Sequence, residues 1–185
     1  ISRTIEENVD LIGKRENYVG YIAMRPRVEK QGSHGLFSQK DEVINLDEVS
    51  KAVAEHEGAV WTTIMSLRRE DAERLGYDNA SAWREMLRGQ SLKLAKAMGI
   101  PLPDLRWYAA FHNEGQHPHI HLVSYSVGKE PYMTEQGLLK FKSDFAHEIF
   151  RNDYYHIYQD QTAHRNALRE LSHKKISDIV NQINI

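Results

Sequence analysis

The histidine-rich segment FHNEGQHPHIHLV, residues 111–123, contains the side chains of this chain that are best suited to do chemistry. It holds His112, His117, His119 and His121, among ten histidines in 185 residues. Residues two apart in a β-strand point to the same face, so His119 and His121 are expected to project together. Neutral imidazole is a common metal ligand, and this spacing therefore indicates a candidate metal site.

Two predicted strands bring a third histidine to this pair. Residues 104–112 (DLRWYAAFH) and 119–127 (HIHLVSYSV) are rich in apolar and aromatic residues, and only residues 113–118 separate them. A connection this short favours an antiparallel hairpin. His112 would then end the first arm opposite His119, which begins the second, and His117 would be spare on the loop side. Three imidazoles would converge, leaving a divalent metal open positions for water or substrate.

A pair of alternating histidines is by itself more often an ordinary surface or core feature than a ligand pair. The third histidine, placed to meet the pair across the hairpin, makes a metal site the favoured interpretation. Imidazole suits zinc, manganese, iron and nickel better than magnesium on affinity grounds, although availability can override that preference.

Composition limits the class of protein. Hydrophobic residues make up 41% of the chain, which is enough for a core, and the formal net charge of -2 disfavours a protein that coats nucleic acid by charge alone. No apolar run is long enough to span a membrane. Cysteine is absent, so disulfides and thiolate metal sites are excluded, and we expect a cytoplasmic protein. The first residue is Ile1, which suggests a fragment of a longer protein.

The remaining pattern predicts an α+β fold: an antiparallel β-sheet with flanking helices and a helical C-terminal extension. A helix over residues 6–24 is expected to end before Pro26. After a loop with a short strand, Asn45 or Asp47 could cap a helix reaching His56. A strand then follows over residues 59–67, with helices over 69–77 and 79–99. Residues 134–185 are predicted to be mostly helical, as two or three helices beginning at a Thr134 cap.

Several of these stretches together resemble the HUH-type relaxases of the MobP class, in the MobL-like branch. The resemblance rests first on His112, Glu114, His119 and His121, followed by an apolar strand. It also rests on YVGYIAMRP near the N-terminus, and on the stretches GSHGLF, PYMTEQGLLKFK and IYQDQT. It covers most of the chain, from about residue 17 to about residue 162. The histidine motif is fairly specific, and the tyrosine segment is less so.

The resemblance implies a fold and a reaction. The histidine strands would lie at the centre of the sheet, with the tyrosine helix above it. The enzyme would nick one DNA strand at an origin of transfer, through a 5′-phosphotyrosyl intermediate, to mobilise a plasmid or conjugative element. The partners would be single-stranded DNA, and possible accessory relaxosome proteins and a coupling protein. Residues 1–185 would form a single relaxase domain.

The resemblance also implies roles for particular residues. His112, His119 and His121 would bind a divalent metal, with Mn²⁺ or Mg²⁺ favoured and Zn²⁺ or Ni²⁺ also compatible in crystals. Tyr21 would be the nucleophile, with Tyr18 as the alternative, and Glu114 would hydrogen-bond a ligand histidine or accept the tyrosine proton. The guanidinium groups of Arg25 and Arg27 would contact phosphate.

One departure from the family concerns the N-terminus. Relaxases of this class have a first strand before the tyrosine helix, whereas residues 1–16 read as helix or irregular chain. That strand would lie upstream of this sequence, or the N-terminus would be rebuilt.

Two other functions fit parts of the sequence. His117, His119 and His121 also match the alternating pattern of histidine-triad nucleotide hydrolases, in which His119 would be the nucleophile without a metal. Pro118 fits poorly inside the strand that this motif needs. The third reading is a non-catalytic DNA-binding relic of the relaxase fold.

Overall fold

A four-stranded antiparallel sheet carries the histidine motif. The computed structural model describes residues 15–40 and 42–183. The strands are β1 (Leu36–Ser38), β2 (Val60–Ser66), β3 (Leu105–His112) and β4 (His119–Ser126), in the order β1-β3-β4-β2. The central pair is the predicted hairpin, so the expectation that the histidine strands occupy the centre of the sheet is confirmed.

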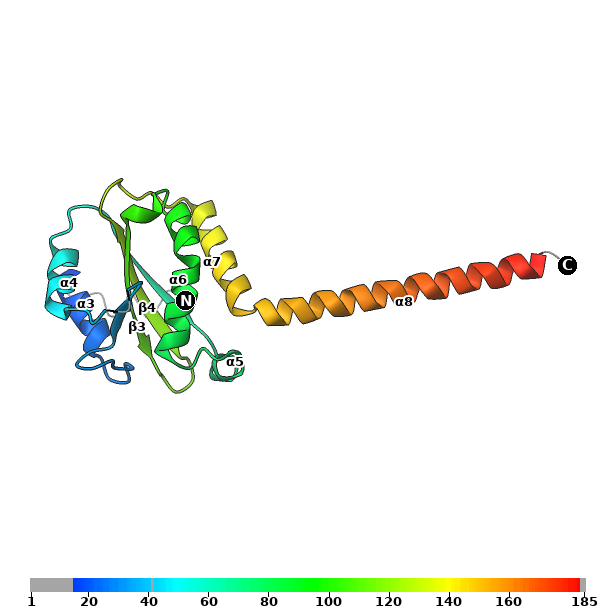
Figure 1. Cartoon of the computed structure of the whole chain (residues 1–185), viewed down its shortest axis with the longest axis horizontal. Coiled ribbons are helices and arrows are strands. Elements are labelled where there is room, and N and C mark those ends of the chain that lie inside the picture. The colour runs from blue at the N-terminus through cyan, green and yellow to red at the C-terminus, as the bar shows by residue number, and fades with distance from the viewer. Residues whose placement is uncertain (1–14, 41, 184–185) are drawn as a thin grey trace. The chain divides into compact units, whose positions relative to one another are not determined.

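Helices flank this sheet, which confirms the predicted α+β class (Figure 1). In chain order the helices are α3 (Arg15–Met24), α4 (Leu46–Ala54), α5 (Arg69–Leu75), α6 (Ala80–Ala97), the 3-10 turn η1 (Leu102–Asp104), α7 (Glu135–Ile149) and α8 (Arg151–Ile183). The predicted helix over residues 6–24 is described only from residue 15. Its first part, and the missing family strand, lie outside the described residues.

The two faces of the sheet are covered by different helices. Figure 1 shows α3 and α4 against one face and α6 against the other. Because side chains alternate along a strand, Trp107 and Phe111 of β3 face α6, whereas Ala110 and His112 face α3 and α4. Val19 and Ile22 of α3 are fully buried in the same apolar cluster as Ala110. The cluster therefore seats α3 on the face that carries the histidines.

Capping residues set where the helices around the sheet begin. The Asn45 side-chain oxygen accepts hydrogen bonds from the backbone N–H groups of Asp47 and Glu48, so Asn45 is the cap of α4 and Asp47 lies inside the helix. Asn79 caps α6 in the same way, by accepting from the N–H of Ala82. These bonds satisfy N–H groups that the first helical turn leaves without partners.

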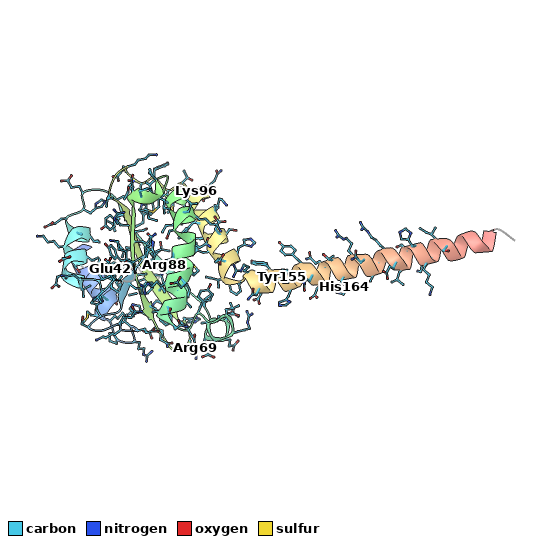
Figure 2. The ribbon with its side chains drawn as sticks, viewed as in Figure 1. Glu42, Arg69, Arg88, Lys96, Tyr155 and His164 are labelled. Carbon is cyan, nitrogen blue, oxygen red and sulfur yellow. The ribbon has the colours of Figure 1, made fainter. Side chains whose placement is uncertain are left out.

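The chain divides into two compact units, Ile1–Phe145 and Ala146–Ile185. The first contains the sheet and the histidine motif. The second consists of the end of α7 and the long α8, on which Figure 2 labels the exposed Tyr155 and His164. The assignment of all 185 residues to one relaxase domain stays a prediction. Among the described helices, none combines the length and apolar character that crossing a membrane requires.

Candidate metal centre

The hairpin register brings three histidine rings together. His112 of β3 pairs directly with His119 of β4, and His121 lies two residues further along the same face. The centroid of the His112 ring lies 5.2 Å from that of His119 and 4.8 Å from that of His121, and the last two are 5.1 Å apart. One nitrogen from each ring lies within 4.8 Å of the others. The predicted convergence on one face is therefore confirmed.

Burial keeps these rings neutral near neutral pH. It lowers the pKa of His112 from 6.5 to about 4 and that of His121 from 6.5 to about 3, with the neighbouring imidazoles adding to the effect. Burial also lowers the pKa of His119. The positive charge of Arg25 contributes in the same direction at all three. A neutral imidazole has a free nitrogen lone pair, which is the form that binds a metal.

The hydrogen bonds of the rings point the same nitrogen inward. The Nδ1 atom of His119 lies 2.9 Å from the carbonyl oxygen of His117, and Nδ1 of His121 lies 3.1 Å from the Tyr18 hydroxyl. The Nε2 atom of His121 is buried and has no hydrogen-bond partner among the described residues. Histidines that bind metals commonly use one nitrogen for the ion and hydrogen-bond through the other. The donor set therefore fits a divalent metal held by Nε2 of His119 and His121 and by one ring nitrogen of His112.

His112 is the most deeply buried of the three histidines. Its side chain is fully inaccessible, and neither ring nitrogen makes a well-formed hydrogen bond within the described part of the chain. The backbone of Ile22 opposes the lowering of its pKa, but only as a minor effect. A buried polar atom without a partner is costly, and an ion at this position would remove that cost.

Helix α3 presents its two tyrosines differently. Tyr18 contacts the histidine cluster through His121, and burial raises the pKa of its hydroxyl from 10.0 to about 12. Tyr21 is half-buried and packs beside the apolar cluster under α3. The guanidinium carbon of Arg25 lies 5.4 Å from the centre of the Tyr21 ring. Both candidate nucleophiles therefore lie on the face of the sheet that carries the histidines.

A turn after α3 ties that helix to the end of β3. Arg27 adopts a φ of 67°, which is uncommon for a residue other than glycine. Its carbonyl oxygen accepts a hydrogen bond of 2.9 Å from the N–H of Asn113, and Val28 forms a β-bridge with His112. The N–H of Glu29 donates to the carbonyl of Phe111 at 2.9 Å. The turn that follows the tyrosine helix is thus joined by direct backbone contacts to the strand end that carries His112.

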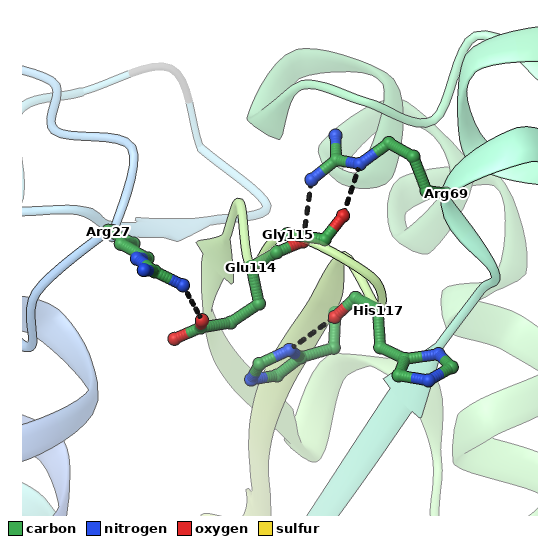
Figure 3. A network of polar contacts seen from close by, with 6 residues as sticks. Arg27, Arg69, Glu114, Gly115 and His117 are labelled. Carbon is green, nitrogen blue, oxygen red and sulfur yellow. Dashed lines mark hydrogen bonds and ion pairs between the residues drawn. The ribbon is translucent and has the colours of Figure 1, made fainter.

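Glu114 pairs with Arg27 instead of with a ligand histidine (Figure 3). The Arg27 guanidinium lies 2.6 Å from the Glu114 carboxylate, and this hydrogen bond holds the pKa of Glu114 below its ordinary value. The expected bond from Glu114 to a metal-ligand ring is not among the contacts of its carboxylate in the described structure. Arg27 remains 63% exposed along its side chain, so it still faces solvent beside the cluster.

Sequence reasoning missed Arg69, which reaches the loop between the two histidine strands (Figure 3). Its guanidinium donates to the backbone carbonyls of Glu114 and Gly115, and those contacts connect residues that are 45 and 46 positions apart. The one available signal was a pair of cations, Arg68 and Arg69, placed where a strand ends. His117, predicted to be spare, is exposed and contributes its carbonyl oxygen to His119.

Comparison with known families agrees with this geometry. A family model described as MobL relaxases matches residues 10–184, which is nearly the whole chain. The chain belongs to the MobL relaxase family. Comparison with curated proteins and with solved structures finds no match. Membership in the MobL family supports a DNA-nicking enzyme of the relaxase kind, and the histidine cluster is compatible with the metal that such enzymes use.

Proposed function

We propose that this MobL relaxase is a metal-dependent, site- and strand-specific transesterase that nicks single-stranded DNA at an origin of transfer. The Tyr21 hydroxyl oxygen attacks the scissile phosphorus, and a 5′-phosphotyrosyl bond forms as the bond from phosphorus to the 3′ oxygen breaks. The hydroxyl proton leaves Tyr21, and the departing 3′ oxygen takes up a proton to become a free 3′-hydroxyl. The reverse sequence rejoins the strand.

The observation that carries the proposal is the convergence of three neutral imidazoles, each with a ring nitrogen directed at the same point. A bound Mn²⁺ or Mg²⁺ would neutralise nonbridging phosphate oxygens and stabilise the charge of the transition state. His112, His119 and His121 would hold it. Its open positions would face the phosphate, because three protein ligands do not fill the coordination of a divalent ion.

Tyr21, not Tyr18, is the nucleophile in this proposal. The Tyr18 hydroxyl lies against Nδ1 of His121, and the nitrogen left for the metal is Nε2, on the opposite side of the ring. Tyr18 is therefore placed behind the ligand and orients it. Its raised pKa, to about 12, also disfavours the phenolate that attacks. Tyr21 has no such engagement with a ligand ring among the described contacts.

Arg25 and Arg27 are the proposed contacts to DNA phosphate. Arg25 acts electrostatically on all three histidines, and Arg27 is exposed beside them. An incoming phosphate would compete with Glu114 for Arg27. The released carboxylate would then be available to accept the tyrosine proton. Accessory relaxosome proteins, a coupling protein and a cytoplasmic location belong to this proposal through the family.

The histidine-triad alternative is weaker than the relaxase. The His117 ring is exposed in the loop and is not part of the cluster, and Pro118 precedes β4. The family model that matches the chain describes MobL relaxases, which are a different family from the histidine-triad hydrolases. The relic alternative predicts DNA binding without cleavage, so the same experiment distinguishes it.

The test is a cleavage assay with overlapping labelled oligonucleotides from both strands of the DNA that flanks the gene of this protein. Each is incubated with the protein and Mn²⁺ or with EDTA, and the products are separated on a denaturing gel. We expect a covalent protein–DNA adduct on one strand, dependent on metal, and lost in Tyr21→Phe and in His119→Ala. Tyr18→Phe is compared with Tyr21→Phe at saturating Mn²⁺ and should still form the adduct there.

The outcomes separate the candidates. An adduct that survives Tyr21→Phe but disappears in Tyr18→Phe would move the nucleophile to Tyr18. Hydrolysis of nucleotides that is insensitive to EDTA and lost in His119→Ala would support the histidine-triad hydrolase. DNA binding with no product on any strand would support the relic.

A further inference from the structure

The loop over residues 113–118 connects the ends of the two histidine strands, where His112 pairs with His119. His112 precedes it and His119 follows it directly. A Cβ placed on Gly115, in the middle of the loop, would meet no atom within 4 Å. Gly115 itself therefore has open space where a side chain would be, and hydrogen bonds hold the carbonyls of this part of the loop.

Arg69 supplies a group of those hydrogen bonds from the first turn of α5. Its Nε donates to the Gly115 carbonyl at 2.8 Å, and its Nη2 donates to the Glu114 carbonyl at 2.5 Å. The backbone N–H of Arg69 donates to the carbonyl of Gln116 at 3.0 Å. Three consecutive carbonyls of the loop are thus held by one residue. A planar guanidinium suits two neighbouring acceptors, which a lysine ammonium would not match.

The linker before Arg69 is fixed to the same loop. The N–H of Leu67 donates to the carbonyl of Pro118 at 3.0 Å, just before His119. Leu67 follows β2, which pairs with β4 through the register Ser66 to His119. The pairing of β2 with β4 therefore fixes where the Arg69 backbone lies. From there the guanidinium hydrogen-bonds the loop carbonyls.

We propose that Arg69 is a positioning residue for the metal centre. By holding three carbonyls of the loop, it sets the distance between His112 and His119 and so the affinity for a divalent ion. The inference rests on the proposed function only for the presence of the metal, not for the DNA reaction. Arg69 is distinct from Arg27, whose guanidinium binds the Glu114 side chain and whose backbone carbonyl accepts from the N–H of Asn113 at the start of the loop.

Arg69 is not arranged as a DNA contact. Its side chain is 25% exposed, and its donors are already directed at carbonyl oxygens. The Glu73 carboxylate also lies 3.9 Å from its Nε atom. The neighbouring Arg68 is exposed and caps α5 without a side-chain hydrogen bond. Arg68→Ala therefore removes the same charge one position away and is the matched control.

The experiment measures Mn²⁺ binding by calorimetry with the full chain, without DNA. The wild type, Arg69→Ala, Arg69→Lys and Arg68→Ala are compared, and the melting temperature of each is recorded in EDTA. We expect Arg69→Ala to bind Mn²⁺ about tenfold more weakly, at the lower end of the cost of losing an outer-shell partner. Arg69→Lys should also bind more weakly, because it keeps the charge but not the two-pronged contact. Arg68→Ala should bind as the wild type does.

Affinity and stability report different things here. A merely structural arginine would lower the melting temperature in EDTA while leaving the affinity of the folded protein unchanged, and that result would overturn the proposal. Equal weakening in Arg68→Ala and Arg69→Ala would overturn it too, since charge alone would then be responsible. If Arg69→Ala does not fold, Arg69→Lys decides by the same comparison with Arg68→Ala.

The DNA reaction is tested separately from this role. A wild type that binds Mn²⁺ but forms no DNA adduct would reject the proposed function and leave the affinity comparison intact. A wild type that binds no Mn²⁺ would overturn the positioning role of Arg69.

Discussion

The two faces of the central hairpin use the same backbone for opposite purposes. Toward α6, β3 and β4 present buried apolar side chains such as Trp107, Phe111 and Leu122. Toward α3 and α4, the same strands present the histidines at one end. Phe111 and His112 are adjacent in sequence and both are fully inaccessible, yet one stacks near Trp83 and the other has no well-formed hydrogen bond among the described residues.

This difference shows that burial has two meanings in one strand. On the α6 side it stabilises the fold, because apolar area is removed from water. On the α3 side an apolar cluster is buried too, but at the histidine end burial removes both nitrogens of His112 and Nε2 of His121 from water without well-formed hydrogen bonds among the described residues, which costs stability. Buried nitrogens without hydrogen-bond partners are suited to bind a ligand that satisfies them, and here the donor set fits a metal ion. The predictions that follow test whether the two faces separate in this way.

The largest effect is expected for His112→Leu. Losing a direct ligand should weaken Mn²⁺ binding by more than the roughly 100-fold that removal of an outer-shell partner can cost, and nicking should be lost. Without metal, the free energy of unfolding of the variant should equal that of the wild type or exceed it by about 1 kcal/mol, because buried nitrogens without good hydrogen-bond partners are removed. Calorimetry with Mn²⁺ and urea unfolding in EDTA measure both. A large loss of stability with metal binding retained would contradict the comparison.

Phe111→Ala should give the opposite result one position earlier. A fully buried phenylalanine leaves a cavity, and such changes cost about 3–5 kcal/mol of unfolding free energy. The protein that remains folded should still bind Mn²⁺, because no ligand has changed. Urea unfolding in EDTA gives the first quantity and calorimetry the second. A Phe111→Ala protein as stable as the wild type would mean that the α6 face is not the stabilising one.

The metal-free protein should become less stable as pH falls. The pKa of His112 is lowered from 6.5 to about 4 and that of His121 from 6.5 to about 3, so between these values the unfolded chain binds more protons than the folded one. The stability of the neutral rings is complete above pH 6.5 and is lost as pH falls toward 4. Melting in EDTA across this range measures it. The fall should be shallower in His112→Leu, and an equal slope would exclude the histidines as its cause.

Tyr18→Phe should have the smallest effect. It removes the hydroxyl that lies 3.1 Å from His121 but keeps the ring, so the ligand loses its orientation without losing its packing. Mn²⁺ binding should weaken about tenfold or less, and adduct formation should persist at saturating Mn²⁺. Calorimetry and the cleavage gel give the two values. A complete loss of adduct at saturating Mn²⁺ would make Tyr18 more than an orienting residue.

Local patterns predicted the convergence of the three histidines well. The short connection after His112, and the alternation of His119 and His121, were enough to give the hairpin, its register and the shared face, because period and loop length act over a few residues. The cap of α4, predicted at Asn45 or Asp47, and the helical character of residues 134–185 follow from equally local rules. The family resemblance then gave the class of enzyme.

Long-range contacts were beyond such reasoning. The Tyr18–His121 contact spans 103 positions, and the Arg27–Glu114 pair spans 87. No spacing rule connects residues that far apart, so Glu114 was expected at a ligand ring and is found on Arg27. Arg69 was missed for the same reason. The order of residues in the sequence does not indicate which arginine hydrogen-bonds which backbone carbonyl.

The backbone contacts of the turn after α3 have a consequence for how the site opens. The N–H groups of Glu29 and Asn113 are donated across the junction between that turn and β3. Neither amide can exchange with solvent unless the two segments part, so both should exchange in a single step. The tyrosine helix and the first histidine would then be lost or regained as one cooperative unit. A partly unfolded chain would have neither the tyrosine nor the histidines in position. It could therefore not cleave DNA and leave an unsealed nick.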